Sequence, residues 1–135
     1  MSPMKDAGHF LALVGLPGSG KSSLAVAVAK LLGGAAFTEP EDWPPAVSER
    51  QDVSAFPGLM WFRAMRVPML YEAAAIRDSG GVAVLDSYYD KLCAHWLRRA
   101  EMAWLLPPTD PWADLAVAIA ERDWQLLPRA DVAAS

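Results

Sequence analysis

A glycine-rich segment near the start of the chain constrains its fold more than any other feature. Residues 15–22 read Gly-Leu-Pro-Gly-Ser-Gly-Lys-Ser, which fits the Gly-x-x-x-x-Gly-Lys-Ser/Thr pattern of the P-loop (Walker A motif) at every fixed position. Residues 10–14 form a continuous apolar run, typical of a parallel strand buried on both faces. Apolar residues then recur at helical spacing until Gly33-Gly34. The sequence therefore predicts a strand, a phosphate-binding loop and a helix in this order.

The residue types of the loop indicate its chemistry. Glycines allow successive backbone N–H groups to converge on phosphate oxygens, and a helix N-terminus adds a favourable dipole. We expect Lys21 to reach the outer phosphates of ATP and the Ser22 hydroxyl to bind Mg²⁺. The residues predicted to bind the nucleotide are Gly15, Pro17, Gly18, Ser19, Gly20, Lys21, Ser22 and Ser23.

Composition excludes several classes of protein. The chain has 135 residues and a net charge of −4, without a basic stripe, so duplex nucleic acid is not expected as a partner. The single cysteine, Cys93, cannot form an internal disulfide and fits a reducing compartment, so we expect a cytoplasmic protein. No apolar segment reaches the length of a membrane span, so no membrane association is expected.

The pattern along the chain alternates strands and helices. Strands are predicted at 10–14, 35–38, 82–86 and 130–133, and helices at 21–32, 59–78, 88–105 and 111–126. This order predicts one α/β domain over residues 1–135, with helices layered on a parallel sheet. Pro68 is expected to kink its helix or end the first half. Asp110 is predicted to cap the last helix, with Pro111 as its first residue. The proline-rich segment 40–57 is predicted to loop over the carboxyl edge of the sheet.

Asp86 is a second candidate for phosphate chemistry, because the apolar strand predicted at 82–86 ends in this carboxylate. In P-loop proteins, an aspartate at the end of a neighbouring strand can hold magnesium. The spacing from Ser87 to Asp90 also fits a capping box, so this region can simply begin the next helix. The two interpretations are compatible, and the first predicts a metal site formed by Ser22 and Asp86.

Two further side chains are candidates for binding a phosphate acceptor. Glu39 follows the apolar segment 35–37, and a carboxylate at a strand tip can take a proton from a substrate hydroxyl. The alternative is a solvated loop glutamate, which the spacing alone favours. Trp43, in the proline-rich segment, can stack on a base.

Arg63 and Arg66 lie three residues apart and share a face of their predicted helix with apolar residues. A charge on an apolar stripe is costly unless it is paired. These arginines are therefore expected either to meet carboxylates or to reach over the sheet edge to a substrate, and their spacing does not separate these alternatives.

The order of these features resembles the thymidylate kinase and deoxynucleoside kinase superfamily of P-loop kinases, over about residues 10–133. Its members transfer the γ-phosphate of ATP to a nucleoside or nucleoside monophosphate. Glu39-Pro40 is similar to the Glu-Pro pair after the second strand of thymidylate kinases. Glu39 and Trp43 also resemble the general base and nearby tryptophan of deoxynucleoside kinases, with the spacing one residue shorter. Residues 64–66, Ala-Met-Arg, resemble an Ala-Asp-Arg segment whose arginine binds substrate.

The resemblance implies an ATP-dependent and Mg²⁺-dependent kinase acting on a small-molecule acceptor. It assigns catalysis to Lys21, Glu39 and Asp86, and assigns acceptor binding to Glu39, Trp43, Arg63 and Arg66. A non-catalytic nucleotide-binding module and an ATPase are the alternatives.

The chain departs from the family pattern in two places. The family has an arginine after the strand-end acid where this chain has Ser87, so the resemblance names no particular acceptor. In the family, a segment like 127–132 leads into a further strand, an arginine-rich lid and a closing helix, whereas this chain stops at Ser135. We therefore expect the C-terminal lid and last strands to be missing. A fragment, a truncated gene product and a protein completed by a partner or by homodimerisation are the alternatives.

Overall fold

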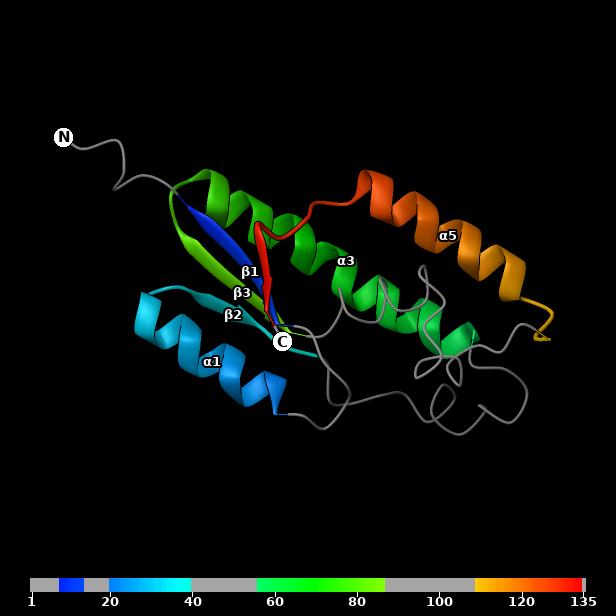
Figure 1. The fold of residues 1–135 in the computed structure, drawn as a ribbon, viewed down its shortest axis with the longest axis horizontal. Helices are drawn as coiled ribbons and strands as arrows, with labels where there is room; N and C mark the ends of the chain where they lie inside the picture. Colours follow the sequence, from blue (N-terminus) through cyan, green and yellow to red (C-terminus); the bar gives the residue numbers. More distant parts are fainter. Residues whose placement is uncertain (1–7, 14–19, 40–55, 87–108, 135) are drawn as a thin grey trace.

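A computed structural model describes residues 8–13, 20–39, 56–86 and 109–134 of the chain (Figure 1). Its elements are, in chain order, β1 (His9–Leu13), α1 (Lys21–Leu32), β2 (Ala35–Phe37), α3 (Phe56–Asp78), β3 (Val82–Asp86), α5 (Ala113–Leu126) and β4 (Val132–Ala134). This is the alternation that the sequence predicts, with strand and helix ends shifted by a few residues. The helix predicted at 88–105 lies outside the described residues.

The strands form a parallel sheet between layers of helix. The strand order is β2-β3-β1-β4, and each neighbouring pair is parallel. Helix α1 lies against one face, while α3 lies against the other with α5 alongside it (Figure 1). The prediction of a layered α/β fold with a parallel sheet is confirmed.

Side chains of β1 and β3 alternate between the two faces, which gives the sheet two cores. Phe10 and Leu85 are fully buried in the core beneath α3, together with Leu70 of that helix. Leu13 and Val84 pack instead with the buried alanines of α1. Because strand side chains alternate with a period of two, the residue after Leu85 is directed to the α1 side.

Helix α3 begins at Phe56, three residues before the predicted start, and continues through Pro68. The ring of Phe56 stacks on Trp112, with centroids 5.0 Å apart, and this contact between distant segments favours the additional turn. Pro57 stands near the helix start, where the missing N–H costs little. Of the two alternatives for Pro68, an end to the first half of the helix is wrong, since the fully buried Leu70 anchors the next turn to the core. The kink stays a prediction.

The last helix begins later than predicted. The Asp110 carboxylate accepts a hydrogen bond from the Trp112 N–H at 2.8 Å, and the Asp110 carbonyl accepts one from the Ala113 N–H at 3.0 Å. These bonds make a tight turn of the kind that aspartate favours. Helix α5 therefore starts at Ala113 with Trp112 at the N-cap position. The predictions of Asp110 as the cap and of Pro111 as the first helical residue are both wrong.

Asp131 fixes β4 beside β1. Its carboxylate accepts from the Phe10 N–H at 2.9 Å, and its own N–H donates to the Phe10 carbonyl at 2.7 Å. Arg77, at the end of α3, donates to the same carboxylate at 3.2 Å. Desolvation acts to lower the pKa of the Arg77 guanidinium, but Asp78 and Asp131 more than offset it, so its pKa lies above the ordinary value.

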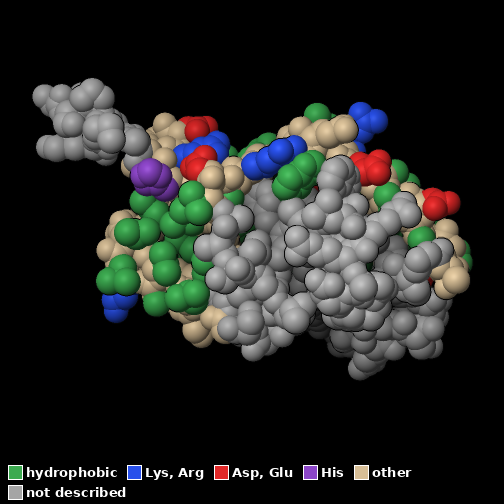
Figure 2. Space-filling view, in the orientation of Figure 1, with side chains coloured by type: hydrophobic (Ala, Val, Ile, Leu, Met, Phe, Trp, Pro, Cys, Tyr) green, Lys and Arg blue, Asp and Glu red, His purple; other side chains and the backbone are tan. Residues whose placement is uncertain are grey.

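Hydrophobic side chains also lie on the surface. Figure 2 shows them gathered over the part of the molecule formed by α1 and the adjacent strands, and α1 exposes Leu24, Val26, Leu31 and Leu32. Within the described ranges, no helix combines the length and apolar character that a bilayer crossing requires. Homodimerisation stays a prediction.

Candidate functional site

The carboxyl ends of three strands meet at one edge of the sheet. Leu13, the last residue of β1, is level with Asp86, the last residue of β3, and Phe37 of β2 is level with Leu85. Glu39 is half-buried and follows β2 by two residues. The chain therefore brings the end of β1, Asp86 and Glu39 to the edge where open α/β sheets bind ligands.

Ser22 and Asp86, the residues predicted to bind magnesium, are in direct contact. The Ser22 hydroxyl, in the first turn of α1, donates to Asp86 Oδ2 at 2.6 Å across 64 positions of the sequence. Asp86 is fully buried, whereas Ser22 is exposed. The contact follows from the alternation of β3, which directs Asp86 toward α1.

The two oxygen donors fit a magnesium ion. Mg²⁺ prefers carboxylate and hydroxyl oxygens, and neighbouring ligands of its octahedral shell lie about 2.9 Å apart. The 2.6 Å separation of Ser22 Oγ and Asp86 Oδ2 comes close to this spacing. In the part of the chain that the structure describes, no cluster of three or more His, Cys, Asp or Glu side chains is placed to hold a metal.

Arg66 holds the other side of the same carboxylate. Its Nη2 donates to Asp86 Oδ1 at 2.8 Å and also to the Asp86 main-chain carbonyl, while Nη1 contacts Met69 Sδ at 3.3 Å. Both side chains of this ion pair are 0% exposed. The structure therefore places Arg66 against a carboxylate, as the first of the two sequence alternatives predicts, and its assignment to acceptor binding stays a prediction.

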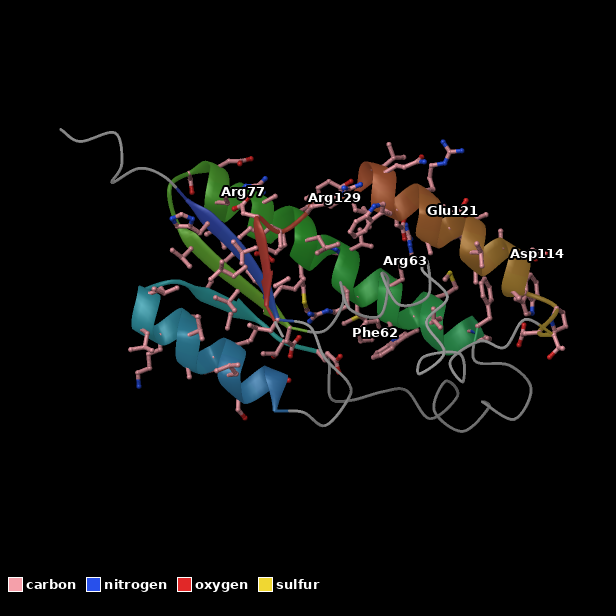
Figure 3. The ribbon with its side chains drawn as sticks, in the orientation of Figure 1. Phe62, Arg63, Arg77, Asp114, Glu121 and Arg129 are labelled. Atoms are coloured by element: carbon pink, nitrogen blue, oxygen red, sulfur yellow. The ribbon has the colours of Figure 1, made fainter. Side chains whose placement is uncertain are left out.

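Arg63 joins two helices. Its Nε and Nη2 donate to the two carboxylate oxygens of Asp123 on α5, at 2.6 and 2.7 Å, and the side chain points from α3 toward α5 (Figure 3). Asp123 is not among the residues predicted from the sequence. A signal was present, since Asp123 continues the buried stripe of Ala113, Ala116 and Ala120 at helical spacing. A buried acid on such a stripe predicts a cationic partner.

The N-terminus of α1 suits an anion. Gly20 precedes the helix with φ 84°, a left-handed conformation that favours glycine, and among the described residues no side chain caps this end. The first turn contains no acidic residue. Since the first N–H groups of a helix lack intrahelical acceptors, this end presents donors and a positive dipole next to the Ser22 hydroxyl.

Replacing Gly20 by alanine tests this geometry. We expect a loss of about 1 kcal/mol in the free energy of unfolding, because alanine is strained at this φ although the described residues place no atom within 4 Å of the new Cβ. ATP affinity should fall as well. Gly33→Ala is the matched control, with φ 66° and equally open surroundings at the far end of α1. We expect both variants to lose similar stability, but only Gly20→Ala to bind ATP more weakly. Equal ATP affinity in the two variants would contradict a role for Gly20 in nucleotide binding.

The remaining predicted residues divide into two groups. Lys21 is the first residue of α1, and Ser23 is exposed in the same turn. The others lie outside the described residues, and their roles stay predictions: Gly15, Pro17, Gly18, Ser19 and Trp43.

The class of fold is that of P-loop proteins, since a parallel α/β sheet carries the P-loop sequence between its first strand and first helix. Among solved structures, the chain is similar to the crystal structure of thymidylate kinase from Ehrlichia chaffeensis. The TM-score is 0.54 at 14% sequence identity, and the match covers 94% of this chain and 73% of that one. No protein-family model and no curated protein sequence matches the chain. The likeness shows a distant P-loop kinase-like fold.

Proposed function

We propose that the protein is an ATP-binding phosphotransferase that moves the γ-phosphate to a nucleoside or nucleoside monophosphate. The observation that carries this proposal is the 2.6 Å contact between Ser22 Oγ and Asp86 Oδ2, at the carboxyl edge of a sheet of P-loop kinase type. This contact joins the last position of the P-loop motif to a strand-end carboxylate, which is the oxygen pair that a magnesium–nucleotide complex requires.

In this proposal, the chain acts mainly by positioning and by charge neutralisation. The loop amides of residues 15–22 bind the phosphates, and Lys21 neutralises charge on the outer ones. Ser22 and Asp86 hold Mg²⁺, which neutralises phosphate charge when it is bound. Where the acceptor is a nucleoside, Glu39, beyond β2, accepts the proton of its hydroxyl or orients this group.

An assay of ATP consumption with and without a panel of nucleosides and nucleoside monophosphates tests the proposal. Turnover that requires an acceptor is expected, with a phosphorylated acceptor as product. Turnover at the same rate without any acceptor indicates an ATPase. Nucleotide binding without turnover indicates a non-catalytic module, and both of these outcomes contradict the kinase.

Glu39→Gln tests the proposed base. We expect phosphoryl transfer to slow by about 10²- to 10⁴-fold, because glutamine cannot accept the proton, while the affinity for ATP is retained. Glu72→Gln, an exposed site on α3, is the matched control and should transfer phosphate at the wild-type rate. Steady-state kinetics with saturating ATP measure both variants. A wild-type rate in Glu39→Gln would make Glu39 a solvated loop residue.

A further inference from the structure

The ion pair beneath the proposed magnesium site has a role that the resemblance does not assign. We propose that Arg66 is a positioning residue, which holds the Asp86 carboxylate in the orientation that presents Oδ2 to Ser22 and so sets the affinity of the nucleotide site for Mg²⁺. This inference rests on the proposed function, because it concerns the metal that accompanies the nucleotide.

The hydrogen bonds divide the carboxylate between two partners. Arg66 Nη2 binds Oδ1 at 2.8 Å and leaves Oδ2 to the Ser22 hydroxyl at 2.6 Å. The same Nη2 also binds the main-chain carbonyl of Asp86, so one donor spans the backbone and the side chain of a single residue. Two bonds of this kind restrict rotation of the carboxylate relative to β3.

Contacts on its own helix fix the guanidinium in turn. The group lies over the Phe62 ring, 5.9 Å from its centroid, and Nη1 reaches Met69 Sδ at 3.3 Å. Phe62, Arg66 and Met69 recur at spacings of three to four along α3, so they share one face of this helix. Helix α3 therefore carries a preassembled support for the Asp86 carboxylate.

The burial of Arg66 argues against contact with an acceptor. Its side chain is 0% exposed, so a substrate could touch it only after the surrounding residues had moved. Drawing it away from Asp86 would also break a buried ion pair, which is expensive. By contrast, groups that orient a metal ligand from behind are commonly buried and hydrogen-bonded, and replacing them typically weakens metal binding by about 10- to 100-fold.

Isothermal titration of the full chain with ADP, in EDTA and then in excess Mg²⁺, tests the proposal without relying on activity. The quantity compared is the gain in ADP affinity that Mg²⁺ produces. In Arg66→Lys we expect this gain to fall by about tenfold or to disappear, with metal-free ADP affinity unchanged. Lysine keeps the positive charge but lacks the planar fork of arginine.

Arg77→Lys is the matched control, because it makes the same change in the last turn of α3, where the partners are Asp78 and Asp131. Its Mg²⁺ gain should equal that of the wild type. A full gain in Arg66→Lys overturns the proposal. Equal losses in the presence and absence of Mg²⁺, or equal losses in both arginine variants, also overturn it, since they indicate a general structural role.

Two further outcomes are separable from these. If Arg66→Lys does not fold, judged by circular dichroism, Arg66→Gln replaces it with Arg77→Gln as the control, because glutamine keeps an N–H donor without charge. If the wild type binds no ADP under either condition, the proposed function fails together with this inference. If it binds ADP with no gain from Mg²⁺, the role of Arg66 and the magnesium site of Ser22 and Asp86 fail, whereas the nucleotide site stands.

Discussion

Replacing Lys21 by alanine is expected to abolish ATP turnover, with a loss of at least about 10²- to 10³-fold in kcat, while the fold is retained. The ammonium of a P-loop lysine neutralises the charge of the outer phosphates, and no other residue of the motif carries a positive charge. Initial rates with a turned-over acceptor, together with ATP titrations, measure the effect. A thermal melt of the variant should match that of the wild type.

Lys30→Ala is the control for this prediction. Lys30 lies exposed in the last turn of the same helix, α1, so its replacement makes an identical change in charge away from the sheet edge. Its ATP affinity and turnover should equal those of the wild type. Unchanged ATP affinity and turnover in Lys21→Ala would contradict the nucleotide site itself.

The parts of the fold that the sequence predicts well are those specified by local pattern. The apolar run of β3 and the helix that ends at Gly33 have the predicted bounds, because periodicity and glycine chemistry operate within a few residues. The start of α3 was missed because it depends on a contact between segments distant in sequence. Phe56 stacks on Trp112, more than fifty positions away, and neither residue carries a helix-start signal of its own. The start of α5 was missed because Asp110 forms a tight turn with Trp112 and Ala113 in place of a first helical turn.

The same division applies to the site. The meeting of Ser22 and Asp86 was predictable, since a P-loop motif and a strand-end acid converge whenever the two strands are parallel neighbours. The partners of Arg63 and Arg66 were not, because helical spacing places a charge on a face but does not reveal the opposing element. Only the packed structure shows that Arg63 pairs with Asp123 on α5 and that Arg66 pairs with Asp86 on β3.

Asp86→Ala is expected to have the largest effect on stability, lowering the free energy of unfolding by about 3–5 kcal/mol. The change removes the carboxylate from a guanidinium that is 0% exposed, and the desolvation cost of that buried charge is no longer offset by its ion pair. A loss of this size is a large part of the stability of an ordinary domain. Urea unfolding followed by circular dichroism measures it, with Asp114→Ala on the exposed first turn of α5 as the control.

The double variant Arg66→Met/Asp86→Ala separates charge from packing. Methionine fills much of the space of the arginine stem without a charge, so the double variant should recover a large share of the stability lost in Asp86→Ala. The gain in ADP affinity from Mg²⁺ should stay absent in both variants, because each lacks the ligand oxygen. Recovery of stability without recovery of the Mg²⁺ effect would show that the attraction within the ion pair offsets the desolvation cost of burying it. It would also show that Asp86 Oδ2 is needed for Mg²⁺ binding. If the double variant is no more stable than Asp86→Ala, the stability lost in Asp86→Ala comes from lost packing and not from the unpaired buried charge.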